Sequence, residues 1–245
     1  MKAFAAALGF LSRIPVPLSV LADDKARRGS PLYYPLVGAL LGALLMLLHM
    51  LLAGWLPNLL LAALVLLAWV WLSGGLHLDG LADSADAWVG GLGDRKKTLT
   101  IMKDPASGPM GVIALLLVLL LKFAALASLP DAPLALFVAV FAGRLVLLPA
   151  LLATPYVRAN GLGSGLAPTP RAGWLITLLG LAPLALLPPY LAVAVLACLL
   201  LVFWRWRRAC MQRLGGCTGD TLGALLEITE TSVLLLCVAV WPYWA

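Results

Sequence analysis

The chain has 245 residues, of which 63% are hydrophobic and only 11% are charged, and its formal net charge is +6. Soluble globular domains carry about 25% charged residues, so this composition excludes a soluble protein and indicates an integral membrane protein. The positive balance does not indicate nucleic-acid binding, because the basic residues lie in short segments between apolar runs, where they orient membrane proteins.

Apolar segments follow one another along the chain, most of them near the length of about 20 residues that a helix needs to cross a bilayer. We therefore predict an all-α, polytopic integral membrane protein with about seven transmembrane helices, forming a single domain over residues 1–245. Residues 1–30 are expected at the cytoplasmic membrane surface, and residues 74–108 are expected to form a cytoplasmic loop that carries an acidic motif. The predicted spans are Leu32–Gly54, Leu59–Ser73, Met110–Leu129, Pro133–Ala153, Gly173–Leu187, Tyr190–Trp204 and Thr221–Trp241.

The distribution of basic residues predicts how the chain is oriented in the membrane. Two of the 17 lysines and arginines, Lys122 and Arg144, lie within predicted spans. All the others precede the first span or lie in the connections after the second, fourth and sixth spans. By the positive-inside rule this side faces the cytoplasm, so we predict a cytoplasmic N-terminus and an external C-terminus.

The first acidic cluster lies in the stretch "GGLHLDGLADSADAWVGG" at residues 74–91. Asp79, Asp83 and Asp86 follow one another at i, i+4 and i+7, which places them within about 60° on one helix face. Three carboxylates on one stripe repel one another, and a hard divalent cation such as Mg²⁺ is their natural partner. His77 lies roughly opposite this stripe and is either a proton carrier or ligand, or an interfacial histidine. A solvated helix end is the alternative for the whole stretch, but it leaves the dense glycines unexplained.

The second acidic cluster lies in "GGCTGDTLGALLEITETS" and supplies Asp220, Glu227 and Glu230. In a helix that starts at the cytoplasmic side, the two glutamates lie about 10 and 15 Å beyond Asp220. Ionisable groups at that depth are costly and usually functional, although a buried structural pair with Arg144 would also explain them. Because both clusters lie on the cytoplasmic side, they could face each other across one cavity. The predicted metal ligands are Asp79, Asp83, Asp86, Asp220, Glu227 and Glu230.

Candidate phosphate contacts lie between the two clusters. In "IMKDPASGPMGV", Ser107 could cap a helix that has Pro109 in its first turn. The free N–H groups of such a helix end bind phosphate readily. The predicted substrate-binding residues are Lys103, Ser107, Arg144 and Arg158. These residues together indicate metal-assisted chemistry on a phosphorylated substrate, in which a carboxylate takes the proton of an attacking alcohol.

Several stretches of the sequence, in this order over about residues 10–237, resemble the cobalamin synthase family of adenosylcobinamide-GDP ribazoletransferases. They are "FLSRIPVP", "YYPLVGALLGAL", "GGLHLDGLADSADAW", "IMKDPASGPMGV" and "GGCTGDTLGALLEITE". The resemblance implies an Mg²⁺-dependent enzyme of vitamin B12 synthesis in the bacterial cytoplasmic (inner) membrane. Its substrates would be a corrinoid nucleotide, adenosylcobinamide-GDP, and α-ribazole or its 5′-phosphate. The ribose hydroxyl would attack the corrinoid-linked phosphorus, GMP would leave, and adenosylcobalamin or its phosphate would form.

The family motifs fall on residues that the chemistry had already singled out. The first motif covers His77, and Asp83 or Asp86 is then expected to act as the base. Trp88 departs from the pattern, which has a glycine at that position. We expect membrane lipid to surround the protein. A homo-oligomer is possible on this sequence, which does not specify the number of metal ions.

Two alternatives of different kinds remain from the sequence. One is a membrane phosphotransferase that acts on a CDP-alcohol or a polyprenyl-linked lipid. The other is an ion-coupled transporter with a relay made of Glu227, Glu230, Arg144 and Lys122.

Overall fold

The computed structural model describes residues 1–129, 132–158, 166 and 168–240. The described residues form helices and loops, and their only β-type pairing is an isolated bridge between Tyr156 and Cys217. Short elements begin the chain: α1 (Lys2–Leu11), α2 (Leu18–Leu21), α3 (Asp24–Gly29) and η1 (Ser30–Tyr33). The middle contains α4 (Tyr34–Leu52), α5 (Asn58–Ser73), α6 (Leu76–Gly90), α7 (Arg95–Ile101), α8 (Pro109–Ser128), α9 (Ala132–Leu145) and α10 (Leu147–Ala153). The last elements are α11 (Pro170–Leu181), η3 (Ala182–Leu186), α12 (Pro189–Leu214) and α13 (Gly219–Val240).

Five helical stretches of the described chain are long and apolar enough to cross a membrane, and a sixth results if the bent pair α5–α6 counts as one span. The five are Asp24–Leu52, Pro109–Ser128, Pro133–Ala153, Pro189–Leu214 and Gly219–Val240. The all-α, polytopic membrane class is thereby confirmed. The fifth predicted span corresponds to the shorter apolar helix Pro170–Leu186. The orientation of the termini stays a prediction, and Trp241, the predicted end of the last span, lies outside the described residues.

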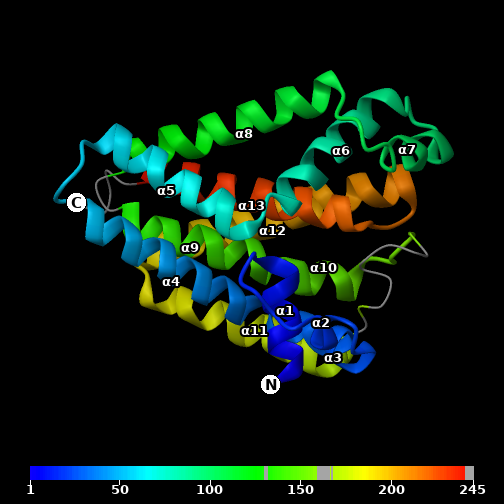
Figure 1. The fold of residues 1–245 in the computed structure, drawn as a ribbon, viewed down its shortest axis with the longest axis horizontal. Coiled ribbons are helices and arrows are strands. Elements are labelled where there is room, and N and C mark those ends of the chain that lie inside the picture. The colour runs from blue at the N-terminus through cyan, green and yellow to red at the C-terminus, as the bar shows by residue number, and fades with distance from the viewer. Residues whose placement is uncertain (130–131, 159–165, 167, 241–245) are drawn as a thin grey trace.

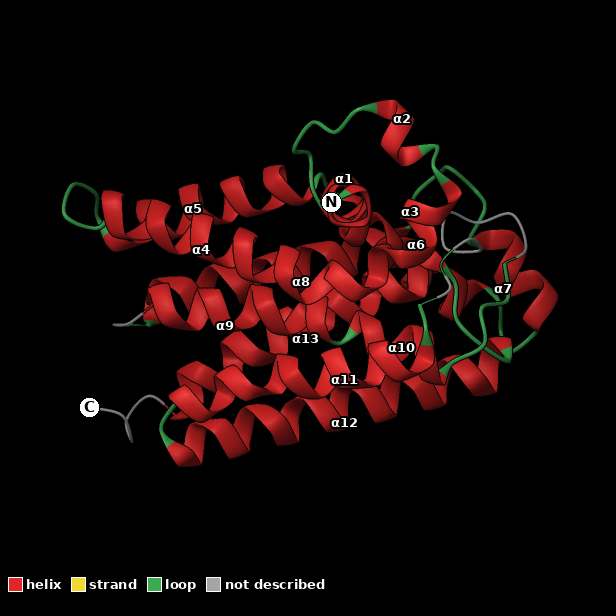
Figure 2. Ribbon diagram, turned by 90° about the horizontal axis from the view of Figure 1, so that it is seen from below, coloured by secondary structure: helices red, strands yellow, loops and turns green. Residues whose placement is uncertain are grey.

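The long helices run roughly alongside one another, and α13 lies within the bundle (Figures 1 and 2). Helix α13 contacts α6, α8, α9, α10 and α12, and most of its side chains are buried. The C-terminal end of α13 lies at one end of the bundle, and α7 lies at the other (Figures 1 and 2). We call this other end the basic end, because it carries the basic residues of α7 and of the last turns of α12. These residues are Arg95, Lys96, Lys97, Arg207, Arg208 and Arg213.

A sharp bend separates α5 from α6 and redirects the acidic motif. Gly74 and Gly75 both have a φ of 74°, in the left-handed region that glycine adopts at little cost. The two helix axes consequently differ by 87°. The segment 74–108 was predicted as a loop, but in the structure it is largely helical and contains α6 and α7. Helix α7 is capped at its N-terminus by Asp94, whose side chain accepts a hydrogen bond from the Lys97 N–H at 2.7 Å.

Helix α12 corrects another predicted boundary. The sixth span was expected to end at Trp204, with the following arginines in a loop. Instead the helix continues to Leu214 and ends at Gly215, which has a φ of 71°. The residues of this last section have good intrinsic helix propensity, so basic side chains do not interrupt the helix. The arginines are thereby fixed on the last turns of α12 at the basic end.

Candidate functional site

The first acids of the two clusters meet where α6 crosses the start of α13. Glycines on both helices allow this approach: a Cβ atom on Gly80 would lie 2.7 Å from the Asp220 carbonyl oxygen. A Cβ atom on Gly223 would lie 3.1 Å from the Cα of His77. Small residues of this kind let helix backbones pack closely in membrane proteins. The glycine spacing in both motifs thus brings together helices that are about 140 residues apart in the sequence.

A short loop after α10 adds a positive charge to this crossing. The Val157 N–H donates to the Cys217 carbonyl at 2.9 Å, and the Cys217 N–H donates to the Pro155 carbonyl at 2.8 Å. This pairing fixes the loop beside the first turn of α13. Arg158 Nη1 then donates to Asp220 Oδ2 at 2.7 Å, and their side chains are 29% and 18% exposed. Arg158, a predicted phosphate contact, is therefore the counter-ion of a predicted metal ligand.

A cavity of about 240 Å³ opens at this place, near the basic end of the bundle. His77, Asp79, Arg158 and Asp220 form its polar side. Both ring nitrogens of His77 are buried and have no hydrogen-bond partner among the described residues. An unsatisfied buried polar group costs free energy unless a ligand or water pairs with it. The histidine therefore presents unused hydrogen-bonding capacity beside the cavity.

Asp83 extends the carboxylate cluster one turn beyond Asp79. It interacts electrostatically with Asp79 and Asp220, and the nearby Arg158 offsets part of their negative charge. Three carboxylates facing one guanidinium leave a surplus of negative charge, which a bound cation would neutralise. These hard oxygen donors suit Mg²⁺ in their chemistry.

Asp86, the third acid of the motif, has protein partners instead. Its carboxylate accepts hydrogen bonds from the Gly108 N–H at 2.7 Å and the Gly111 N–H at 2.9 Å. It thereby satisfies free donors at the N-terminus of α8 and is favoured by the helix dipole. The expectation that Ser107 caps this helix is wrong, because the N-cap is Gly108 and Ser107 is exposed. A side chain 22 residues away in sequence occupies the position that we had predicted for a phosphate.

Removal of the Asp86 carboxylate is expected to loosen α8. Asp86→Ala should lower the free energy of unfolding by about 1–2 kcal/mol, the usual effect of losing a helix cap. Ser107→Ala, at the position first expected to provide the cap, should leave it unchanged. Thermal unfolding of both variants in the same detergent checks this. A larger loss in Ser107→Ala than in Asp86→Ala would refute the assignment.

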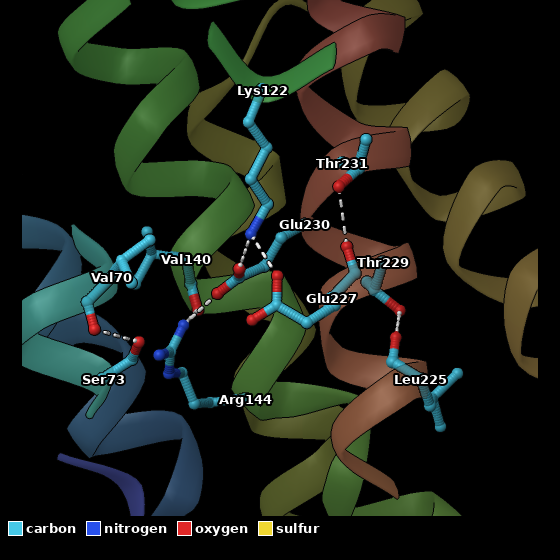
Figure 3. A network of polar contacts seen from close by, with 10 residues as sticks. All are labelled: Val70, Ser73, Lys122, Val140, Arg144, Leu225, Glu227, Thr229, Glu230 and Thr231. Carbon is cyan, nitrogen blue, oxygen red and sulfur yellow. Dashed lines mark hydrogen bonds and ion pairs between the residues drawn. The ribbon is translucent and has the colours of Figure 1, made fainter. Parts of the chain in front are cut away.

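The two glutamates of the second cluster lie in a buried ion-pair network, drawn in Figure 3. Lys122 Nζ donates to Glu227 Oε2 at 2.6 Å and also pairs with Glu230, which in turn pairs with Arg144. All four side chains are at most 4% exposed. Two positive and two negative charges cancel within this group, which we call the buried quartet. Lys122 also lies over the Trp69 ring, 4.2 Å from its centroid, so the quartet connects α5, α8, α9 and α13.

The structure thus separates the six predicted metal ligands into different environments. Among the residues that it describes, no three histidine, cysteine, aspartate or glutamate side chains are grouped closely enough to hold a metal ion. The buried quartet has no free carboxylate for a cation, which also weakens the transporter alternative. Asp79 and Asp220 line the cavity, Asp83 interacts electrostatically with both, Asp86 binds α8, and Glu227 and Glu230 belong to the quartet.

The predicted phosphate contacts are similarly divided. Arg158 lines the cavity, whereas Arg144 is fully buried in the quartet. Lys103 and Ser107 are exposed in the connection between α7 and α8.

Aromatic residues of the cavity were missed by the sequence reasoning. Phe10, Tyr34 and Tyr156 line it together with the acids. The signal was available, because two of them lie in "FLSRIPVP" and "YYPLVGALLGAL", stretches that carried the resemblance without an assigned role. Trp88, the departure from the family pattern, stacks on Trp206 with ring centroids 5.7 Å apart.

Comparison with known proteins identifies the family. The family model described as cobalamin-5-phosphate synthase matches residues 3–238. The chain belongs to this family. No solved structure is significantly similar to it. The family match confirms the resemblance to the cobalamin synthase family that the sequence motifs indicated.

Curated relatives of this family member cover nearly its whole length. A Pseudomonas syringae protein is 53% identical over 240 residues, covering 96% of this chain and 98% of the relative. A Pseudomonas fluorescens protein is 55% identical over 242 residues, with the same two coverages. Both relatives are named adenosylcobinamide-GDP ribazoletransferase.

Proposed function

We propose that this family member is an adenosylcobinamide-GDP ribazoletransferase that transfers the corrinoid phosphate to α-ribazole or its 5′-phosphate and releases GMP. The observation that carries the proposal is the cavity at which Asp79, Asp220, Arg158 and the unpartnered His77 converge. The names of the near-full-length relatives support the choice of substrates. By the positive-inside rule we also propose that the basic end faces the cytoplasm of a bacterial inner membrane.

The reaction is a displacement at phosphorus. The ribose hydroxyl oxygen of the acceptor forms a new P–O bond to the corrinoid-linked phosphorus, and the bond from that phosphorus to the GMP oxygen breaks. The proton of the attacking hydroxyl passes to a carboxylate, for which we propose Asp83. It has no hydrogen-bond or ion-pair partner among the described residues, whereas the Asp86 carboxylate is engaged by two backbone N–H groups.

The remaining residues bind and orient the substrates. We propose that Asp79 and Asp220 hold Mg²⁺, which would neutralise the diphosphate and polarise the phosphorus when bound. Because Asp220 pairs with Arg158, this role requires Arg158 to exchange its carboxylate partner for a substrate phosphate, a bidentate contact that arginine makes well. His77 would donate or accept a hydrogen bond to the acceptor ribose.

Product analysis on the purified protein tests the proposal. Adenosylcobinamide-GDP and α-ribazole together should give GMP and a corrinoid product in equal amounts, as measured by chromatography. EDTA should stop the release of GMP, and added Mg²⁺ should restore it. If the protein forms no GMP from these substrates but releases CMP from a CDP-alcohol, the phosphotransferase alternative replaces this proposal.

A further inference from the structure

The cavity also has an apolar part of its lining that the reaction chemistry does not explain. Besides the charged residues, it is lined by side chains from α1, α4, α10 and α13, which we call the apolar side. The Phe10 and Tyr34 rings on this side are stacked, with centroids 6.1 Å apart and planes within 7°. The apolar lining residues used below are Phe10, Tyr34, Leu147, Leu151 and Leu222.

From this division we infer that the apolar side binds the aromatic base of the acceptor nucleoside, and that the corrinoid and the guanosine of the donor lie outside the cavity. The inference rests on the proposed function. A flat ring placed against the Phe10–Tyr34 pair gains stacking energy in addition to the burial of its area. The ribose attached to that ring would then extend toward His77 and Asp79, where the hydroxyl must react.

The size of the cavity limits how much of either substrate it can enclose. About 240 Å³ lies below the range of roughly 300–1,000 Å³ that is typical of sites for drug-sized ligands. A corrin ring with its amide side chains is far larger than such ligands. A two-ring base with part of its ribose is the component of the two substrates whose size suits the space.

The apolar side should bind the bases of the two nucleosides in the reaction with different affinity. Guanine carries donors and acceptors along its edge, and each would lose its hydrogen bonds to water beside leucine side chains. The dimethylbenzimidazole of α-ribazole has two methyl groups on one edge, so that edge has no hydrogen bond to water to lose. The apolar side therefore favours the acceptor base over guanine.

Leu151 is the position at which this assignment can be tested. Its side chain is partly buried and lines the cavity from α10, so a larger residue there removes space for the base. Leu151→Phe should raise the KM for α-ribazole about tenfold or more, since overpacking of a filled site is unfavourable. The KM for adenosylcobinamide-GDP and the inhibition constant of GMP should stay within about twofold of the wild-type values, as expected for a remote site.

Base selectivity adds a readout that a merely structural role of Leu151 would not change. Leu151→Phe should discriminate against the dimethylbenzimidazole riboside more than against the smaller riboside of unsubstituted benzimidazole. Leu151→Ala has a smaller side chain and cannot crowd the cavity, so it should shift the preference toward bulkier bases. It replaces Leu151→Phe as the test variant if Leu151→Phe does not fold. Leu120→Phe, the same substitution at a 61% exposed position on α8, is the matched control and should leave all constants unchanged.

The outcomes separate this inference from the proposed function. A wild-type protein that forms no GMP from the two substrates refutes the proposed function before any variant is measured. An active wild type whose Leu151 variants keep the same base selectivity refutes the inference alone. A rise in the KM for adenosylcobinamide-GDP or in the inhibition constant of GMP, with the KM for α-ribazole unchanged, would assign the cavity to the donor.

Discussion

Asp83→Asn is expected to lower kcat/KM by about 100-fold to 10,000-fold, the usual contribution of a catalytic base. An asparagine side chain has almost the same shape but cannot take the proton of the attacking hydroxyl. Because Asp83 is only half-buried and has no protein partner among the described residues, the fold should tolerate the change. Initial rates of GMP release, together with the melting temperature of each variant, provide the measurement.

The control for this variant is another aspartate at the same end of the bundle. Asp104 is exposed, and the one hydrogen bond that its side chain makes to a described residue is accepted from the Ala106 N–H of its own turn. Asp104→Asn should therefore retain wild-type kinetics within about twofold. Activity of Asp83→Asn within tenfold of the wild type would show that another group is the base.

Lys122→Met is expected to lower the free energy of unfolding by about 3–5 kcal/mol, because it leaves a buried carboxylate without its partner. Glu227 would lose its ion pair, and Glu230 would keep only Arg144. For a chain of this length, such a loss corresponds to a melting temperature lower by about 10 °C. Thermal unfolding in one detergent measures it.

A charge-balanced double variant separates pairing from packing. Lys122→Met combined with Glu227→Gln removes one charge of each sign, so it should recover at least half of the lost stability. The exposed change Leu120→Met on the same helix is the control and should have almost no effect. A double variant as unstable as Lys122→Met would show that the ammonium group is not needed to balance charge.

The sequence was sufficient to predict the features that depend on local patterns. Apolar run lengths gave the membrane class, and the spacing of Asp79 and Asp83 placed both on one helix at the end that also holds Asp220. The close approach of α6 and α13 depends on Gly80, one of the dense glycines of the first acidic stretch, and on Gly223, which the sequence reasoning had not singled out. Two predicted spans do not form a single helix long enough to cross a membrane. The fifth is interrupted near Pro183, where α11 passes into η3, and the second, α5, ends at the bend that Gly74 and Gly75 make.

Pairings between distant segments could not be read from such patterns. Asp86 lies on the same helix face as the other acids of its motif, but its partners are backbone N–H groups at Gly108 and Gly111. Glu230 lies in the same acidic cluster as Asp220, and only the packing of α8 and α9 against α13 shows that Lys122 and Arg144 neutralise it. Identical side chains therefore differ in role according to the helix that lies opposite.

The position of a bound metal ion tests most directly whether acids from two distant helices act together. The full-length protein in lipid nanodiscs, with Mn²⁺ in place of Mg²⁺ and a non-reactive analogue of the diphosphate, is suited to structure determination by electron microscopy. The ion should lie between the carboxylates of Asp79 and Asp220, with Arg158 turned from Asp220 to the diphosphate. An ion bound at Glu227 or Glu230, or one that contacts a carboxylate of only one of the two helices, would contradict this account.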